Sequence, residues 1–223
     1  MRYIRFVFAI LLVSLLLVNA NVEVLAMETG FSTEEMSQES VDDFLESINL
    51  TFLITDDQLK GRIDSFDVSE NGMVAVAHHL IYTDNIFIYN SEGEFQYGYS
   101  VNSYGVVEVE FDNDNLIICF VRSDVALSVD SNGEVQSVLE IPNTKENEEH
   151  WKYLTYLREK TVGDTKYSLE GFSDYNKVIA RNASGEETVI YDATAEILIY
   201  DLVIAGIFLI GVICAHKKIK RSK

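Results

Sequence analysis

The residues that could bind a metal or take part in acid/base chemistry are scattered along the chain. His78 and His79 are adjacent in an expected strand, so their side chains point to opposite faces and cannot share one metal without a bulge. The stretches FDNDN (111–115) and VDSNGE (129–134) carry carboxylates at alternating positions, as calcium loops do, but neither completes the EF-hand spacing. Turn formation by Asp and Asn explains both stretches. We therefore predict no metal site and no cofactor.

Catalytic signatures are missing from the sequence. It contains no G-x-S-x-G, H-E-x-x-H, phosphate-binding loop or dinucleotide fingerprint. Cys119 lies in the apolar run NLIICFV, which predicts a buried small side chain rather than a nucleophile. We predict no catalytic residue and favour a binding protein over an enzyme. The alternative is an extracytoplasmic acid/base hydrolase, which requires carboxyl groups that converge in a cleft.

Tyrosines on two neighbouring expected strands are the candidate ligand-binding residues. Tyr89, Tyr97 and Tyr99 lie in a segment that is dense in aromatic residues. Such ladders usually stabilise a sheet. If the rings were exposed, they would instead form a platform for a peptide or a glycan, because Tyr is favoured at interfaces.

Short β-rich runs separated by turn residues extend from Leu50 to Tyr191. One group of four runs reads RIDSFDVS to FQYGYSV, a second reads VVEVEF to EVQSVLEI, and a looser third reads WKYLTYL to ETVIYDA. Several of the turns contain NG, EG or SG, in which glycine tolerates positive φ. Glycine in one of these turns, Gly93, recurs 40 residues later as Gly133, and Gly185 follows 52 residues after Gly133. Phe66-Asp67 likewise recurs as Phe111-Asp112, so the pattern indicates repeats.

In strand count and spacing, these groups resemble the blades of WD or NHL-type β-propellers. The resemblance implies a mainly β fold of about three four-stranded antiparallel sheet repeats, as a partial propeller-like or stacked array, over residues 50–195. Three groups leave open sheet edges that must be covered. Three arrangements could cover these edges. Leu50–Thr55 and the preceding helix could supply part of a fourth group, or two chains could meet as a dimer. Alternatively, the sheets could pack as a sandwich or an open array.

An acidic helical segment, residues 27–49, precedes the β-rich region. Ser32 and Glu35 have the spacing of a capping box, and Val41, Phe44 and Ile48 share one helical face. We expect one amphipathic helix over Ser32–Ile48 that packs on the β domain.

The two ends of the chain predict export and anchoring. Arg2 and Arg5 precede an apolar run, which is typical of a secretory signal peptide over residues 1–26, with an uncleaved anchor as the alternative. Residues 196–215 predict a C-terminal transmembrane helix, and the basic tail 216–223 predicts a cytoplasmic end. The expected location is the cell membrane, single-pass, with the β domain outside. Asp201 lies in the expected span, at its outer shoulder or paired with a basic residue of a partner helix.

Charge limits the partners of the exported part. Residues 27–195 hold ten Lys and Arg against 33 Asp and Glu, a net formal charge of −23. Such a surface repels nucleic acid and attracts cations and basic partners. Cys119 is the sole cysteine of this part, so it has no internal disulfide, which fits a bacterial exported protein.

Together these features predict a single-pass, membrane-anchored extracytoplasmic binding or interaction protein. Its expected partners are the membrane and a protein, peptide or glycan, with no nucleic acid. An accessory subunit of a membrane complex, assembled through Asp201, is a second alternative beside the hydrolase.

Overall fold

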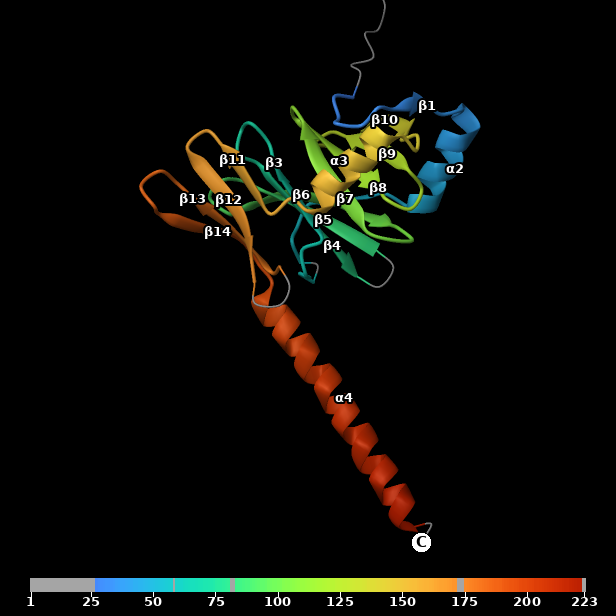
Figure 1. The fold of residues 1–223 in the computed structure, drawn as a ribbon, viewed down its shortest axis with the longest axis vertical. Coiled ribbons are helices and arrows are strands. Elements are labelled where there is room, and N and C mark those ends of the chain that lie inside the picture. The colour runs from blue at the N-terminus through green and yellow to red at the C-terminus, as the bar shows by residue number, and fades with distance from the viewer. Residues whose placement is uncertain (1–26, 58, 81–82, 172–174, 222–223) are drawn as a thin grey trace, which may run out of the picture.

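The structure is a computed structural model that describes residues 27–57, 59–80, 83–171 and 175–221. Figure 1 shows a body of antiparallel sheets, with two helices packed against it and a third helix extending away. The first sheet has the strand order β2-β6-β5-β4-β3, the second β1-β10-β9-β8-β7 and the third β11-β12-β13-β14. The strands of the first sheet are β2 (Thr51–Leu53), β3 (Ser65–Val68), β4 (Val74–Leu80), β5 (Thr83–Tyr89) and β6 (Phe95–Asn102).

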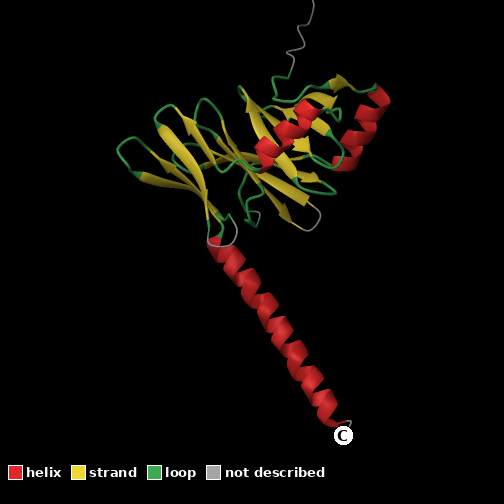
Figure 2. Ribbon diagram, viewed as in Figure 1, coloured by secondary structure: helices red, strands yellow, loops and turns green. Residues whose placement is uncertain are grey.

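The remaining elements follow along the chain. The second sheet consists of β1 (Glu34–Glu35), β7 (Val107–Asp112), β8 (Asn115–Phe120), β9 (Val125–Val129) and β10 (Val135–Glu140). The third sheet consists of β11 (Glu159–Val162), β12 (Thr165–Glu170), β13 (Lys177–Arg181) and β14 (Glu187–Asp192). The helices are α2 (Gln38–Ile48), α3 (Lys145–Thr155) and α4 (Thr194–Arg221), and they lie outside the sheets (Figure 2).

The expectation of three four-stranded sheets is wrong. Each sheet contains a four-strand meander, but within the described residues the sheets have five, five and four strands. The additions are β2, which pairs with β6, and β1, which pairs with β10. Each covers the outer edge of a meander, whose backbone groups would otherwise lack partners. Leu50–Thr55 thus extends the first sheet and does not contribute to a fourth group. Nothing in the structure identifies a propeller family, and the resemblance stays a prediction.

The turn between the last two strands of each meander is the same in all three sheets. Gly93, Gly133 and Gly185 occupy it with φ of 81°, 85° and 84°. In each case the amide of the glycine donates to the carbonyl three residues earlier, at 3.0 Å. The residue that supplies this carbonyl is Asn or Asp, and its side chain also accepts backbone hydrogen bonds within the turn. The recurrence of glycine in the sequence therefore marks equivalent turns.

The core lies between the sheets. One buried cluster joins the first and second sheets and is covered by the apolar face of α2. A second cluster joins the first and third sheets through aromatic residues that include Phe87, Tyr89 and Tyr191. A third lies under α3 and contains Cys119, which is fully buried, as the sequence predicted.

Two helix expectations are corrected. The helix α2 begins at Gln38 with Ser37 as its N-cap, and Ser32 is bound to α3 instead of capping a helix. The run Trp151–Leu157, expected as a strand, lies mostly in α3. Thr144 caps this helix, and acidic residues occupy its first turn, which favours a helix N-terminus.

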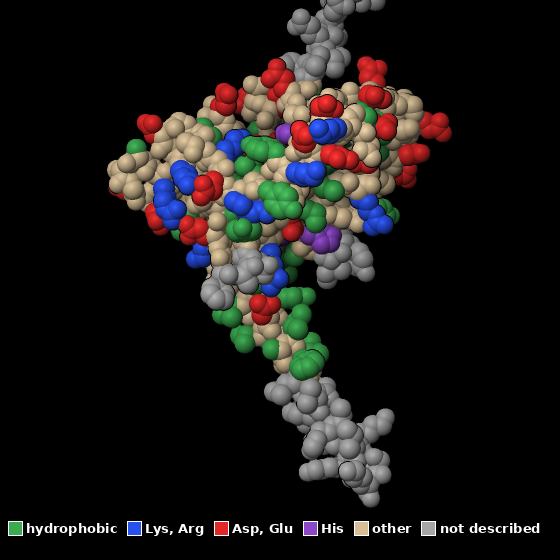
Figure 3. Space-filling view, in the orientation of Figure 1, with side chains coloured by type: hydrophobic (Ala, Val, Ile, Leu, Met, Phe, Trp, Pro, Cys, Tyr) green, Lys and Arg blue, Asp and Glu red, His purple; other side chains and the backbone are tan. Residues whose placement is uncertain are grey.

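The expected transmembrane helix over residues 196–215 is also corrected. The helix α4 occupies this range, but among the described residues no helix is both long and apolar enough to cross a membrane. Glu196 and Asp201 place carboxylates in its first turns, and the apolar stretch 202–215 spans about 21 Å, less than the ~30 Å of a hydrocarbon core. Figure 3 shows exposed apolar side chains on the first turns of α4 and many acidic ones on the body. The expected signal peptide, residues 1–26, lies outside the described residues, as do the side chains of the expected tail 216–223.

Candidate functional site

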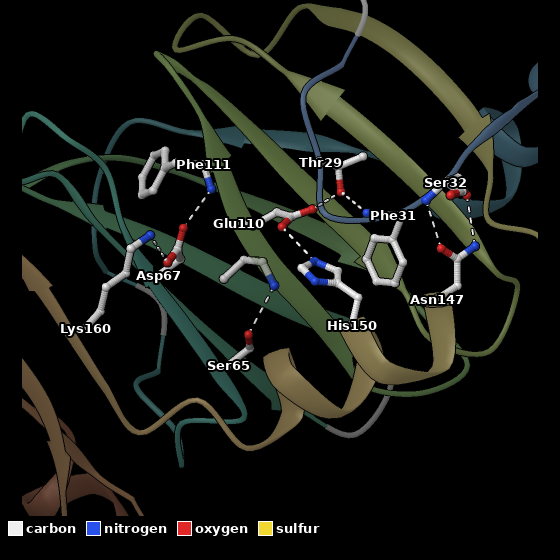
Figure 4. Close-up of polar contacts among 11 residues, drawn as sticks. Thr29, Phe31, Ser32, Ser65, Asp67, Glu110, Phe111, Asn147, His150 and Lys160 are labelled. Atoms are coloured by element: carbon white, nitrogen blue, oxygen red, sulfur yellow. Dashed lines mark hydrogen bonds and ion pairs between the residues drawn. The ribbon is translucent and has the colours of Figure 1, made fainter. Parts of the chain in front are cut away.

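The inner edges of the first two sheets meet through side chains instead of a backbone ladder. Both β3 and β7 are edge strands. The hydroxyl of Ser65 accepts a hydrogen bond from the amide of Val109 at 3.1 Å, and the Asp67 carboxylate accepts from the amide of Phe111 at 2.8 Å. Figure 4 shows both side chains pointing from β3 to β7. Two otherwise unpaired amides of an edge strand are thereby satisfied.

Lys160 brings the third sheet to the same place. Its Nζ atom, on β11, lies 2.6 Å from Oδ1 of Asp67 (Figure 4). The Asp67 side chain is 5% exposed and that of Lys160 is 31% exposed. Burial raises the pKa of the Asp67 carboxyl above its usual value, while the Lys160 ammonium and the backbone amides act in the opposite direction. One buried carboxylate therefore contacts groups on two other strands from two other sheets.

A polar pocket of about 600 Å³ lies at this meeting point, and we call it the junction pocket. In each sheet, the turn that follows the first strand of the meander contributes to the lining. These turns, with the strand residues that lead into them, supply Ser69 and Glu70, Asp112 and Asn113, and Val162 and Gly163, and the lining also includes Glu28, Val68, Phe111, Lys160 and Thr161. Equivalent turns from three sheets thus surround one pocket.

The lining of the junction pocket is acidic. Its charged residues are Glu28, Glu70, Asp112 and Lys160. Because the Lys160 ammonium is paired with Asp67, it does not offset the three lining carboxylates. Glu28 and Glu70 are exposed, and Oδ2 of Asp112 accepts from the amide of Glu28 at 2.8 Å. The pocket can therefore attract a cationic group and offer it several oxygen acceptors.

The N-terminal segment, residues 27–35, closes one side of this region. Thr29 donates to the Glu110 carboxylate, which also contacts Nε2 of His150 at 3.1 Å (Figure 4). The Phe31 ring is buried and lies edge to face with the His150 ring, with centroids 4.4 Å apart. Asn147 then holds Ser32, since its Oδ1 accepts from the Ser32 amide at 2.8 Å and its Nδ2 donates to the Ser32 carbonyl at 2.9 Å. These contacts fix the position of Glu28 in the pocket lining.

The candidate tyrosines lie away from the junction pocket. Tyr89 and Tyr99 are buried, with 1% and 0% exposure, so their rings do not face solvent in this conformation. Burial raises the pKa of both phenols. Tyr97 is partly buried and stacks on Phe52 with ring centroids 5.9 Å apart. In the structure these rings contribute to the packing between sheets.

Asp201 was expected to lie at the outer shoulder of a membrane span or to pair with a basic residue of a partner helix. In the structure it contacts the β domain of its own chain. Its Oδ1 atom lies 3.5 Å from a guanidinium nitrogen of Arg62, and both side chains are about half exposed. This ion pair links the second turn of α4 to the segment before β3. An exposed pair of this kind contributes little to stability.

The adjacent histidines have separate environments. His78 is fully buried, and its Nε2–H donates to the carbonyl of Leu59 at 2.9 Å. Burial lowers the pKa of His78 to about 4. Nδ1 of His79 lies 3.0 Å from Oδ1 of the buried Asp84. As predicted for a strand, the two imidazoles do not share a partner.

The pair His79 and Asp84 does not complete a catalytic triad. The Ser103 hydroxyl donates to Asp84 and not to His79, so the imidazole is not placed to activate it. Another carboxylate, Glu108, is buried on β7, and burial raises its pKa. Within the described residues its Oε2 atom has no hydrogen-bond partner, and no group of three or more potential ligands is arranged to hold a metal ion.

Comparison with protein-family models, curated proteins and solved structures finds no match for this chain.

Sequence reasoning missed Ser65, Asp67, Glu70 and Lys160. The sequence did contain one signal for this site. The repeated Phe-Asp pair at 66–67 and 111–112 marks β3 and β7, which are the first strands of two of the three meanders. The pairing of Asp67 with Lys160 joins residues 93 positions apart, and no local pattern indicates it.

Proposed function

We propose that the protein is a binding protein whose junction pocket takes a basic group, an ammonium or a guanidinium, of a polar ligand or partner. The observation that carries this proposal is the meeting of three equivalent turns, from three sheets, around one acidic pocket. Sites built where several elements meet are common positions for ligands, because each element contributes separate contacts. Residues 27–195 have a net formal charge of −23, which favours approach of the same cationic partners.

We also propose that binding takes place outside the cytoplasm. The support comes from the sequence, where Arg2 and Arg5 precede an apolar run typical of an export signal. Fusion of a compartment-sensitive reporter to the β domain tests this location. Activity of a reporter that functions only in the cytoplasm would contradict it.

The ligand class is tested with a matched pair of probes. The peptide acetyl-Gly-Arg-Gly-amide and its citrulline counterpart have nearly the same shape, but only the first carries a charge. In calorimetric titrations of the purified protein, we expect the Arg peptide to bind at least about tenfold more tightly, as for a charge-assisted hydrogen bond. Equal affinities would contradict a site for basic groups.

A pair of variants locates the binding. Glu70→Gln removes one carboxylate from the junction pocket, at an exposed position where no change in folding is expected. Glu46→Gln makes the same change on the exposed face of α2, outside the pocket. Glu70→Gln should weaken binding of the Arg peptide several-fold, and Glu46→Gln should leave it unchanged. The same loss in both variants would indicate general charge attraction and not a site.

A further inference from the structure

A second pocket, of about 320 Å³, lies between α2, the loop 102–106 and the connection from β8 to β9. We call it the α2 pocket. Its floor includes the apolar residues Phe44, Ile48 and Phe120, and the rings of Phe44 and Phe120 meet edge to face with centroids 5.0 Å apart. At its rim Tyr104 is 86% exposed and Val121 is 42% exposed. A concave apolar floor beside a few polar groups is the usual form of a small-ligand site.

The charge of this pocket is opposite to that of the chain. The sequence has 36 acidic and 17 basic residues, yet the lining contains Arg122 and no Asp or Glu. Nη1 of Arg122 donates to the carbonyl of Tyr104 at 3.0 Å. Among the described residues no carboxylate pairs with Arg122, so the other guanidinium donors are available to a ligand.

The loop that forms the rim is fixed by buried contacts. The Ser103 hydroxyl donates to the carboxylate of Asp84, which is 1% exposed. The amide of Gly105 donates back to this hydroxyl at 3.4 Å. Asp84 lies on β5 of the first sheet and Arg122 follows β8 of the second sheet, so these contacts hold the loop against both sheets, and a ligand would not have to order it.

We propose that the α2 pocket binds a monocarboxylate joined to one apolar group, such as the C-terminal residue of a peptide or a short acyl chain. The apolar group packs against Phe44, Ile48 and Phe120, and the carboxylate takes the free donors of Arg122. A guanidinium matches a carboxylate with two parallel hydrogen bonds, which a neutral amide cannot accept in the same way. The site is separate from the junction pocket, and its ligand has the opposite charge.

Two acids and their neutral amides test the proposal and distinguish a peptide C-terminus from an acyl chain as the ligand. The probes are N-acetylphenylalanine, which represents a peptide end, and octanoate, which represents an acyl chain, each with its primary amide. We expect at least one acid to bind the purified protein and to exceed its amide by about tenfold. The acid that binds more tightly identifies the source. Failure of both acids to bind at 10 mM, or equal binding of acid and amide, would overturn the proposal.

Variants assign the charge preference to Arg122. Arg122→Gln should abolish the advantage of the acid over the amide, and Val121→Asp, which adds a carboxylate to the exposed rim, should reverse it. Lys152→Gln makes the same charge change as Arg122→Gln on the exposed surface of α3, and it should have no effect. Because Val121 is exposed and its replacement leaves Arg122 in place, this variant tests the pocket even if Arg122→Gln loosens the loop. Retention of the preference in both pocket variants would overturn the assignment.

Discussion

Oδ1 of Asp67 lies 2.6 Å from Nζ of Lys160, and the same buried carboxylate accepts a hydrogen bond from the edge of β7. Groups from all three sheets therefore meet at one side chain, directly behind the junction pocket. The geometry of the proposed binding site depends on this contact, because it holds β11 beside β3.

Replacing Lys160 with Met should destabilise the protein at pH 7. The change leaves the Asp67 carboxylate buried and without its cation, and a loss of about 2 to 3 kcal/mol in the free energy of unfolding is expected in urea denaturation. The double variant Lys160→Met, Asp67→Asn removes the buried charge and should recover part of the loss. A single variant as stable as the wild type would contradict the role of this pair.

The loss in the free energy of unfolding caused by Lys160→Met should be smaller at acidic pH. Burial raises the pKa of Asp67 in the folded state, so this group's contribution to stability is fully present below its unfolded pKa and is lost as the pH rises through its folded pKa. Without Lys160 the folded pKa rises further. Urea denaturation at pH 4 and pH 7 should therefore show a smaller difference from wild type at pH 4, whereas a difference independent of pH would count against this assignment.

Gly30 should not tolerate a side chain. A Cβ atom at this position would lie 2.0 Å from Cε1 of His150, so Gly30→Ala must displace the imidazole or the N-terminal segment. Overpacking of this kind costs about 1 to 3 kcal/mol. Gly206→Ala, where no atom lies within 4 Å of the new Cβ, serves as the control in thermal denaturation. If His150→Ala fails to relieve the defect of Gly30→Ala, the clash is not its cause.

Asn147→Asp should release the N-terminal segment. The change replaces the Nδ2 donor to the carbonyls of Ser32 and Pro142 with an acceptor, at a side chain with 1% exposure. We expect a loss of about 1 to 3 kcal/mol and faster proteolysis before residue 36. Asn143→Asp, an exposed change of the same kind, should behave as wild type. Equal proteolysis of the two variants would show that Asn147 does not hold the segment.

His78 should remain neutral well below the usual range for histidine. Its folded pKa is lowered from 6.5 to about 4 by burial, so the stability that it contributes is present above pH 6.5 and is lost as the pH falls toward 4. We expect a cost of about 2 kcal/mol at pH 5 relative to pH 7.5 from this group. NMR titration of the imidazole resonances provides the measurement, and a midpoint near 6.5 for His78 would refute the prediction.

The sequence predicted local features better than long-range ones. Alternating apolar residues and turn glycines such as Gly93 located most strands, and the apolar run around Cys119 predicted its burial. The run at Trp151 was misread because a short apolar pattern does not separate strand from helix, and here the cap at Thr144 favours the helix. The additions of β1 and β2, and the pocket at Asp67, depend on pairings between distant residues, which local patterns do not encode.

The most direct test of the proposed function is to map where a basic ligand binds. In two-dimensional NMR spectra of the ¹⁵N-labelled protein titrated with acetyl-Gly-Arg-Gly-amide, the account predicts shifts at the amides of Glu70, Asn113 and Gly163, one from each sheet. Shifts confined to one of these turns, or to other parts of the acidic surface, would contradict a binding site formed by the three sheets together.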